Sequence, residues 1–374
     1  LIKVKSRGTD NVTGRKNIVM NGDMRIAQRG TAAVTTSGSF TVDRWKNISN
    51  ASDFSAVQST TVPSGQGFYK SIHISPTSTK SPGSGTYFFT SHYVEGLNMG
   101  HLDWGNSGAK TVTVSFWVRS SKTGIYSMGM KNAGATRSRQ QEYTISAANT
   151  WEKKTITVTG ETSGSWPVDN TRGIAIDFCL AGASSATSTI GSWISANSNM
   201  STNQVNFFDS TSNNFYLTGV QLEVGNSASD FEHRSFVEEL DLCHRYFFKP
   251  ITQNNYAPFP IVFNRTVSTG SNGYFAFNIP LPKPMRTIPT FTHNLSNSNH
   301  AGSGVAAGAG NWQFYWQNQG WGSFAGSGNM SSINRAMSGD SCVHLGNYYI
   351  TPSAVQFDQL AIGKDLTLEF SAEL

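Results

Sequence analysis

The amino-acid sequence predicts an all-β protein: a jelly-roll-like antiparallel β-sandwich followed by a smaller C-terminal β-sandwich, the tip domain. Three observations favour this class. The 374 residues exceed what a single core usually holds. Only 14% of the residues are charged and 37% are hydrophobic, and no apolar pattern of period 3.6 extends far enough for a long helix. Short alternating segments recur between clusters of Gly, Ser, Asn and Pro, which is typical of antiparallel sheets.

Residues 1–16 are polar and rich in turn formers, so we expect a connector there, followed by the sandwich over residues 17–240. The clearest strand of the sandwich spans 111–119, where polar and apolar residues alternate. Its core face is expected to carry Val112, Val114, Phe116 and Val118. Alternation puts Trp117 on the opposite face, although its size makes it a candidate anchor of the core, as it does Trp45.

Three further segments alternate in the same way. Segment 151–159 is expected to turn Ile156 and Val158 inward. Along 173–180, Cys179 is on the opposite face from Ile174, Ile176, Phe178 and Leu180. Along 215–224, one face is predicted to carry Tyr216, Thr218, Val220, Leu222 and Val224. The polar segments 63–85 and 181–206 are too long for hairpin turns and are expected to be functional loops or surfaces buried against a neighbouring chain.

The best helix candidate is 235–242, where Ser235 can cap the helix and Glu238 follows at the spacing of a capping box. We expect a short helical junction over residues 241–249 and the tip domain over 250–374. Strands of the tip domain are predicted at 257–267, 274–280, 287–292, 313–316 and 365–374.

Charge and cysteine content argue against several classes of protein. The net charge of +5 comes from dispersed Lys and Arg residues without a run of five, so no nucleic-acid partner is expected. No apolar run approaches a membrane span and the first residues given lack a signal-peptide h-region, so we expect neither a membrane span nor secretion by the general route. Cys179, Cys243 and Cys342 are expected to be buried small hydrophobes. The 8 histidines fit no metal spacing, and no nucleotide or hydrolase fingerprint occurs, so we expect neither a metal nor a cofactor.

Four motifs occur in order over residues 17–247. The first is NIVMNGDMRIAQRGT at 17–31, and VDRW follows at 42–45. The third is SFWV at 115–118, and the fourth joins TGVQLEVG at 218–225 to FEHR at 231–234. Together they resemble the signature of a domain found in the tail fibres of tailed phages, in particular those of marine podoviruses.

This resemblance implies a virion protein whose jelly-roll domain is closed by residues 215–248 before the chain enters its tip. It further implies a homotrimer, upstream tail or adaptor proteins as partners, and receptor contact in the tip domain. The sequence carries no heptad repeat and no collagen-like repeat. A trimer would therefore be held by sheet faces and loops, or by a coiled coil upstream of Leu1.

The motif residues are expected to have structural roles. Gly22 and Gly30 suit turns or positive φ angles. Arg29, Asp43 and Arg44 can form a charge-assisted pair at a strand end. Because adjacent residues project to opposite faces of a strand, Arg29 is a better partner for Asp43 than Arg44 is. The same structural assignment covers Trp45, Glu232 and Arg234.

The densest acidic cluster comprises Glu232, Glu238, Glu239 and Asp241. Two carboxylates that face each other across a groove could hydrolyse a glycosidic bond. However, adjacent Glu238 and Glu239 diverge by about 100° on a helix, and the helix dipole favours acids in a first turn without any catalytic role. We therefore do not expect an enzyme.

Segment 311–324, NWQFYWQNQGWGSF, interleaves aromatic and amide side chains. Sugar recognition needs this combination, because rings stack on the CH faces of sugars and amides bond their hydroxyls. A core strand is the alternative, since alternation puts Trp312, Phe314 and Trp316 on one face. The predicted receptor-binding residues are Trp321, Phe324, Trp316, Gln319 and Asn318.

The sequence thus predicts the distal region of a phage tail fibre, located in the virion, that adheres non-covalently to a host cell-surface receptor, with a glycan favoured. One alternative is a polysaccharide depolymerase tailspike, which would need a carboxylate pair in a groove, often between chains. The other is a purely structural virion protein, a tail or capsid decoration, in which every aromatic patch is buried.

Overall fold

The structure is a computed structural model that describes residues 15–50, 53–81, 87–182, 186–250, 266–267, 273–287, 289–293, 312–316, 320–322, 342–350, 361–363 and 368–374. The protein is nearly all β, with a jelly-roll-like sandwich followed by a smaller β-rich unit, as the sequence predicts. The chain divides into two compact units, one that ends at Cys243 and one from His244 to Glu373.

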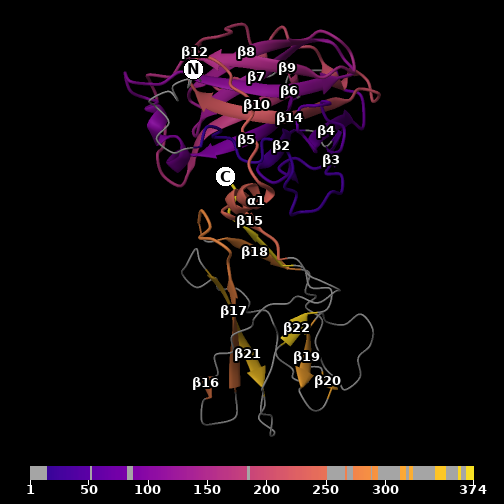
Figure 1. The fold of residues 1–374 in the computed structure, drawn as a ribbon, viewed down its shortest axis with the longest axis vertical. Helices are drawn as coiled ribbons and strands as arrows, with labels where there is room; N and C mark the ends of the chain where they lie inside the picture. Colours follow the sequence, from indigo (N-terminus) through magenta and orange to yellow (C-terminus); the bar gives the residue numbers. More distant parts are fainter. Residues whose placement is uncertain are drawn as a thin grey trace, which may run out of the picture. The chain divides into compact units, whose positions relative to one another are not determined.

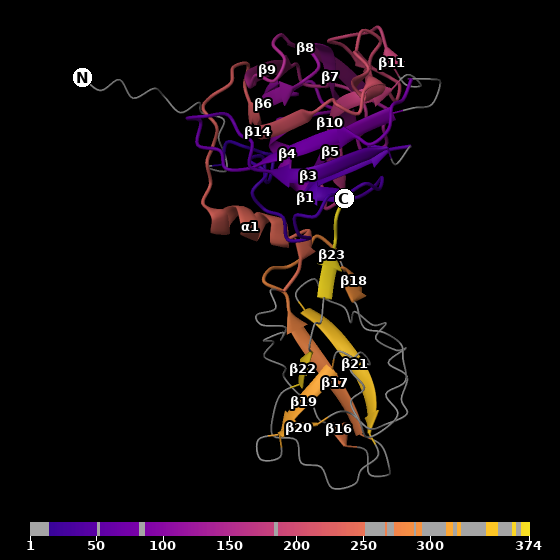
Figure 2. The same cartoon turned by 90° about the vertical axis from the view of Figure 1, so that its right-hand side faces the viewer.

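The first unit is built from two antiparallel sheets (Figure 1). The larger sheet has seven strands in the spatial order β1 (Phe40–Val42), β2 (Trp45–Ser49), β5 (Tyr87–Glu95), β10 (Arg172–Gly182), β7 (Gly124–Asn132), β8 (Ser138–Ile145) and β12 (Trp193–Ile194). The smaller sheet has five in the order β3 (Phe54–Ser59), β4 (Ser71–Pro76), β14 (Phe215–Val224), β6 (Val112–Ser120) and β9 (Glu152–Val158). Figure 2 shows β10 running between β5 and β7.

The inner faces of the two sheets form one hydrophobic core. Trp45, Phe116 and Phe178 lie at its centre and are fully buried, with ring centroids 6.0 Å apart for Trp45 and Phe178 and 4.9 Å apart for Phe116 and Phe178. The inward faces predicted for segments 111–119, 151–159 and 173–180 are confirmed. Alternation of side chains therefore decides which residues of these strands enter the core.

Trp117 does not anchor the core. It is half-buried on the outer face of β6, where its ring lies beside the backbone of Gly219. The prediction from its size is wrong for this residue, and the prediction from strand alternation is right.

Strand β14 changes its core face in the middle. Its pairing with β6 shifts register between Thr218 and Gln221, which marks a β-bulge, and Gly219 there has φ +63°. Phe215 and Leu217 point into the core before the bulge, and Val220 and Leu222 do so after it. The predicted single face with Tyr216 and Thr218 is therefore wrong for the first half of the strand, because the extra residue reverses the alternation.

The two long polar segments contain strands, which corrects their prediction as loops. Residues 63–85 include β4, which pairs with β3 and β14. Residues 181–206 include β11 (Ala186–Thr187), β12 and β13 (Met200–Ser201). β12 extends the seven-stranded sheet, and Met200 packs with Phe89 and Cys179 on the outer face of that sheet. Much of the second segment thus lies against its own sandwich.

A single helix, α1 (Phe236–His244), follows the sandwich in the described residues, and two short 3-10 turns, η1 (Gly96–Asn98) and η2 (Gly100–Leu102), follow β5. The capping box at the start of α1 is confirmed. The Glu238 backbone N–H donates to Ser235 Oγ at 3.2 Å, and the Ser235 N–H donates to Glu238 Oε2 at 2.8 Å. A third 3-10 turn, η3 (Phe207–Asp209), precedes β14.

The described residues of the second unit form three sheets of three strands each. The first sheet has the spatial order β15 (Phe247–Phe248), β23 (Leu368–Ser371) and β18 (Thr290–His293). The second has the order β16 (Thr266–Val267), β17 (Gly273–Pro280) and β21 (Cys342–Ile350). The third has the order β20 (Gly320–Gly322), β19 (Trp312–Trp316) and β22 (Ala361–Gly363). Strands predicted at 274–280 and 313–316 are confirmed, whereas β21 was not predicted.

Within the described ranges, no helix has the length and apolar character needed to cross a membrane. The same ranges hold no group of three or more His, Cys, Asp or Glu side chains arranged to bind a metal ion. Cys179 and Cys243 are buried free thiols.

Candidate functional site

The motifs converge on the second half of strand β14. β14 pairs with β4 only at Phe215–Leu217, so its edge beyond the bulge needs another partner. Residues 17–22 provide it: the Ile18 N–H donates to the Leu222 carbonyl, and the Val220 N–H donates to the Gly22 carbonyl, both at 2.9 Å. Gly22 is needed here because a Cβ on it would lie 2.1 Å from the Val220 carbonyl oxygen. Gly30, by contrast, has the positive φ that was expected, at +100°.

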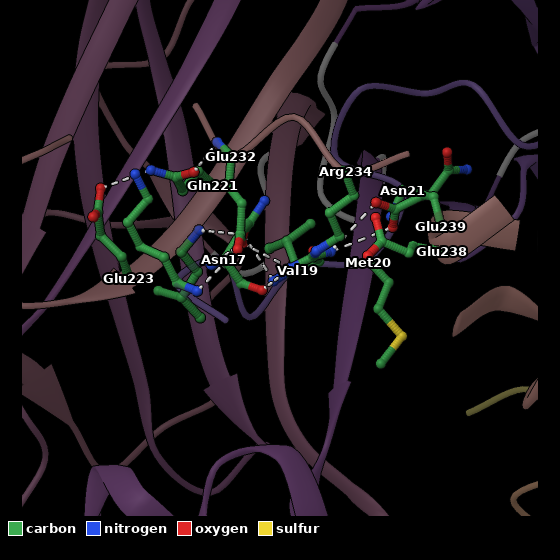
Figure 3. A network of polar contacts seen from close by, with 12 residues as sticks. Asn17, Val19, Met20, Asn21, Gln221, Glu223, Glu232, Arg234, Glu238 and Glu239 are labelled. Carbon is green, nitrogen blue, oxygen red and sulfur yellow. Dashed lines mark hydrogen bonds and ion pairs between the residues drawn. The ribbon is translucent and has the colours of Figure 1, made fainter. Parts of the chain in front are cut away.

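We call residues 17–22 the strap. Glu232 and Arg234 bind it to the end of the sandwich (Figure 3). Glu232 Oε2 accepts from the Asn17 N–H at 2.7 Å. The Arg234 guanidinium donates to the Asn17 and Val19 carbonyls and pairs with Glu232 at 3.1 Å and with Glu239 at 3.3 Å. Arg234 thus joins two backbone carbonyls and two carboxylates, and we call Glu232, Arg234 and Glu239 the clamp.

Glu239 is almost completely buried in this clamp, where it accepts a hydrogen bond from the Asn21 N–H. Burial raises the pKa of the Glu239 carboxyl, and the charge of Arg234 opposes that shift. In contrast, hydrogen bonds from Ser235 lower the pKa of the exposed Glu238 carboxyl. With Glu232 and Glu239 both bonded within the clamp and Glu238 in the capping box, these three acids have structural partners. The fourth member of the acidic cluster, Asp241, lies half-buried further along α1.

The VDRW motif forms a hairpin, not a strand end. Asp43 and Arg44 are the turn between β1 and β2, and Arg44 has φ +73°. The Arg29 guanidinium lies 3.6 Å from Asp43, and Arg44 donates to the Tyr93 carbonyl at 2.5 Å. The Trp45 Nε1–H donates to the Asn21 carbonyl at 2.9 Å. The hairpin thus connects the first two motifs. Arg29 is the partner of Asp43, as predicted, but Asp43 and Arg44 lie in a turn and so do not project to opposite faces of a strand.

A pocket of about 360 Å³ opens beside the clamp. Its lining comes from the strap and the residues before it, the turns η1 and η2, and α1 with the segment that precedes it: Arg15, Asn17, Ile18, Met20, Leu97, Asn98, His101, Arg234 and Leu242. Burial foremost, and then the charge of Lys110, lower the pKa of His101. The pocket is therefore a mixed apolar and polar hollow with a neutral imidazole at neutral pH.

The predicted receptor-binding residues lie outside the described side chains. Asn318, Gln319 and Phe324 are outside the described residues altogether. For Trp316 and Trp321 only the backbone is described: Trp316 is in β19, and Trp321 is in β20, where it is paired with Tyr315 of β19. The role of these five residues stays a prediction.

A patch of rings and cations lies on the outer face of the seven-stranded sheet. Strand register places Phe40 beside Lys46, Lys46 beside Ser91, and Tyr93 two residues further along β5. The Lys46 ammonium is 5.8 Å from the Phe40 ring centroid and 6.0 Å from that of Tyr93. The Arg172 guanidinium is 4.9 Å from the Tyr93 centroid. We call Phe40, Lys46, Tyr93 and Arg172 the outer-face patch; all four are half-buried.

Three polar side chains of the same sheet, Ser91, Lys131 and Asp177, are bonded to one another beside the patch. Asp177 accepts from Ser91 Oγ at 2.5 Å and pairs with Lys131 at 2.8 Å. Burial opposes the charge of Lys131, but the attraction of Asp177 prevails and raises the pKa of the ammonium group. Burial first, and then Asp177, raise the pKa of Tyr93. The Tyr93 phenol therefore stays protonated at neutral pH and can donate a hydrogen bond.

The outer face of the five-stranded sheet carries a different arrangement. Tyr216 stacks on His73 with ring centroids 4.4 Å apart, and the Arg119 guanidinium lies 5.0 Å from the Tyr216 centroid. His73 and Arg119 also bond loop atoms, Asn214 Oδ1 and the Asn149 carbonyl. These contacts hold the Tyr216 ring against its neighbours on the sheet.

The outer-face patch was missed by the sequence analysis. Its residues come from β1, β2, β5 and β10, and no motif links them. The only signal in the sequence is local: Lys46 and Tyr93 each lie between residues that enter the core, so alternation predicts an outward side chain. That signal does not tell which strands lie side by side.

No protein-family model and no curated protein sequence matches this chain. Among solved structures, it is similar to an enzymatically active domain of tailspike protein 4 from bacteriophage CBA120, with 13% identity over 53% of this chain and 22% of that chain and a TM-score of 0.30. It is also similar to TmCBM61, solved with β-1,4-galactotriose (13% identity, 56% of this chain, 100% of that chain, TM-score 0.31). A third is the family 11 carbohydrate-binding module of Clostridium thermocellum (15% identity, 55% of this chain, 99% of that chain, TM-score 0.25). This chain thus spans about a fifth of the matched tailspike chain.

Proposed function

We propose that this chain is the distal part of a phage tail fibre that attaches the virion to its host by non-covalent binding of a surface glycan. The order of the four motifs supports the tail-fibre assignment. The observation that carries glycan binding is the outer-face patch, in which two aromatic rings and two cations lie on one face of a sheet.

The chemistry of the patch suits a sugar ligand. Aromatic rings offer apolar surface to sugar CH groups, and the Tyr93 phenol, Lys46 and Arg172 offer hydrogen-bond donors to hydroxyls. A contact of this size is weak by itself. A homotrimer, which belongs to the proposal, would present three copies and raise the avidity of the fibre.

Binding without hydrolysis is the favoured mode of action. Glu232 and Glu239 are bonded within the clamp, and Glu238 is bonded to Ser235 at the helix start. A depolymerase would release reducing ends from host polysaccharide on incubation with the purified chain. Appearance of such ends would replace the adhesin proposal by the tailspike alternative.

The proposal is tested by binding of the purified chain to a saccharide array, together with Phe40→Ala and Tyr93→Ala variants. We expect each variant to weaken binding about five- to thirtyfold, since loss of a stacking ring costs on the order of 1–2 kcal/mol. Tyr69→Ala is the matched control, because Tyr69 is 71% exposed and remote from the patch in the sequence. A chain that binds no saccharide and does not adsorb to cells would favour the purely structural alternative.

The predicted contact in the tip domain is tested separately with Trp321→Ala. Loss of binding in that variant alone, with Phe40→Ala and Tyr93→Ala unaffected, would move the receptor site from the sandwich to the second unit. Loss in both sets would indicate two contacts along one ligand.

A further inference from the structure

We propose that the outer-face patch selects acidic saccharides, with Lys46 and Arg172 binding a carboxylate or sulfate group of the ligand. This inference rests on the proposed function and names the class of glycan that the site takes.

The outer face of the seven-stranded sheet carries an excess of positive charge. Lys131 is neutralised by Asp177 at 2.8 Å, and Arg29 lies 3.6 Å from Asp43. Within the part of the chain that the structure describes, neither Lys46 nor Arg172 makes an ion pair with a carboxylate. Two positive charges of the patch are therefore left without an acidic partner.

The two charges lie beside the aromatic rings of the patch. Lys46 lies between the rings of Phe40 and Tyr93, and Tyr93 lies between Lys46 and Arg172. A sugar ring that contacts Tyr93 therefore has an ammonium group on one side and a guanidinium group on the other. Arg172 is held in place by hydrogen bonds to the Ala133 carbonyl and to the Tyr93 side chain, and its remaining guanidinium N–H groups are left for a ligand.

A neutral ligand would bind to this patch at a cost in free energy. A neutral sugar over the patch would displace water from both cations without supplying a negative charge. A carboxylate or sulfate takes two parallel hydrogen bonds from a guanidinium and a further contact from an ammonium. The patch therefore discriminates against neutral sugars as well as attracting acidic ones.

The test compares polysaccharides that share a backbone and differ in charge: polygalacturonate with its carboxyl-reduced form, hyaluronate with its carboxyl-reduced form, and dextran sulfate with dextran. Binding of the purified chain is measured by affinity electrophoresis at two salt concentrations. We expect at least one acidic member to bind at least about tenfold more tightly than its neutral counterpart, which corresponds to roughly 1.4 kcal/mol.

Lys46→Gln and Arg172→Gln are each expected to remove most of this preference and to reduce its dependence on salt. Arg119→Gln is the matched control, because it also removes a guanidinium from the face of a tyrosine, on the other sheet. Arg172→Lys should retain part of the affinity, since it keeps the charge but not the paired N–H groups. Unchanged circular dichroism and melting temperature exclude a folding defect.

The outcomes separate the inference from the proposed function. Equal binding of acidic and neutral members overturns the inference and leaves glycan binding intact. Acidic binding that Arg119→Gln weakens as much as Arg172→Gln also overturns it, because the net charge of the chain would then explain the attraction. Failure of all six polysaccharides to bind overturns the inference; the saccharide array then decides whether glycan binding itself stands.

Discussion

Replacing Gly22 by Ala should destabilise the first unit strongly, although the change adds only one methyl group. The added Cβ would lie 2.1 Å from the carbonyl oxygen of Val220 and 3.2 Å from its carbonyl carbon. Both contacts are to backbone, so no side-chain rotation can relieve them. The strap of residues 17–22 must instead move away from β14 by about 1 Å, which is a large displacement in a closely packed interior.

That displacement breaks specific interactions. The Val220 N–H bond to the Gly22 carbonyl is 2.9 Å long, and the Asn17 Nδ2 bond to the Val220 carbonyl is 3.1 Å long. Loss of two such bonds costs roughly 0.5–1.5 kcal/mol each, and overpacking costs about 1–3 kcal/mol more. The total of about 2–6 kcal/mol corresponds to a fall in melting temperature of roughly 4–24 °C for a unit of this size, at about 2–4 °C per kcal/mol.

Thermal unfolding followed by near-UV circular dichroism measures the effect. Gly134→Ala is the matched control, because a Cβ there meets only Thr136 Cγ2, at 3.7 Å. That variant should melt within about 2 °C of the wild type, since surface substitutions without a steric conflict change stability little. A Gly22→Ala protein that melts with the wild type, or a Gly134→Ala protein that falls as far, would refute the strap as an essential partner of β14.

Three further predictions concern the clamp and the core. Burial raises the pKa of the Glu239 carboxyl above its usual 4.5, so its contribution to stability is present below that pH and is lost as the pH rises through the folded pKa. In urea unfolding at a series of pH values, Glu239→Gln should therefore lose less stability than the wild type towards neutral pH. Parallel curves of stability against pH for the two proteins would contradict this. Burial, and then the charge of Arg44, lower the pKa of His92 well below 6.5, so the stability of the protein should fall as the pH falls below 6.5. His92→Gln should flatten this dependence of stability on pH, and an unchanged slope would contradict the role of His92. In denaturant unfolding, Trp45→Ala should lower the free energy of unfolding by about 3–5 kcal/mol and Trp117→Ala by clearly less, because of the two only Trp45 is fully buried. Equal losses of stability would contradict the assignment of Trp117 to the outer face.

Much of the fold follows from local patterns in the sequence. Strands β6 and β10 bury the side chains that alternation selects, and even the opposite orientation of Cys179 is as predicted. The capping box of α1 is equally local, since its two partners are three residues apart. Such features need only neighbouring residues, so the sequence reveals them directly.

The errors occurred where a single backbone feature changes the pattern. The bulge at Gly219 reverses the alternation of β14, and the turn at Asp43 and Arg44 takes both residues out of a strand. Strand β4 was hidden in a segment rich in Ser and Pro, which resembles a loop by composition. Pairing with a distant strand decides the conformation of β14 and β4, whereas the turn at Asp43 and Arg44 is set by the local hairpin of β1 and β2.

The sequence by itself determined an all-β chain, the side chains that enter the core of its regular strands, and the motif segments that build the clamp. Only the tertiary structure decided that Lys46, Tyr93 and Arg172 lie together on one face, because they come from three strands that become neighbours through long-range pairing. Alternation sends each of these side chains outward, but it carries no information about the order of strands in a sheet. The proposed binding surface is therefore a product of sheet topology.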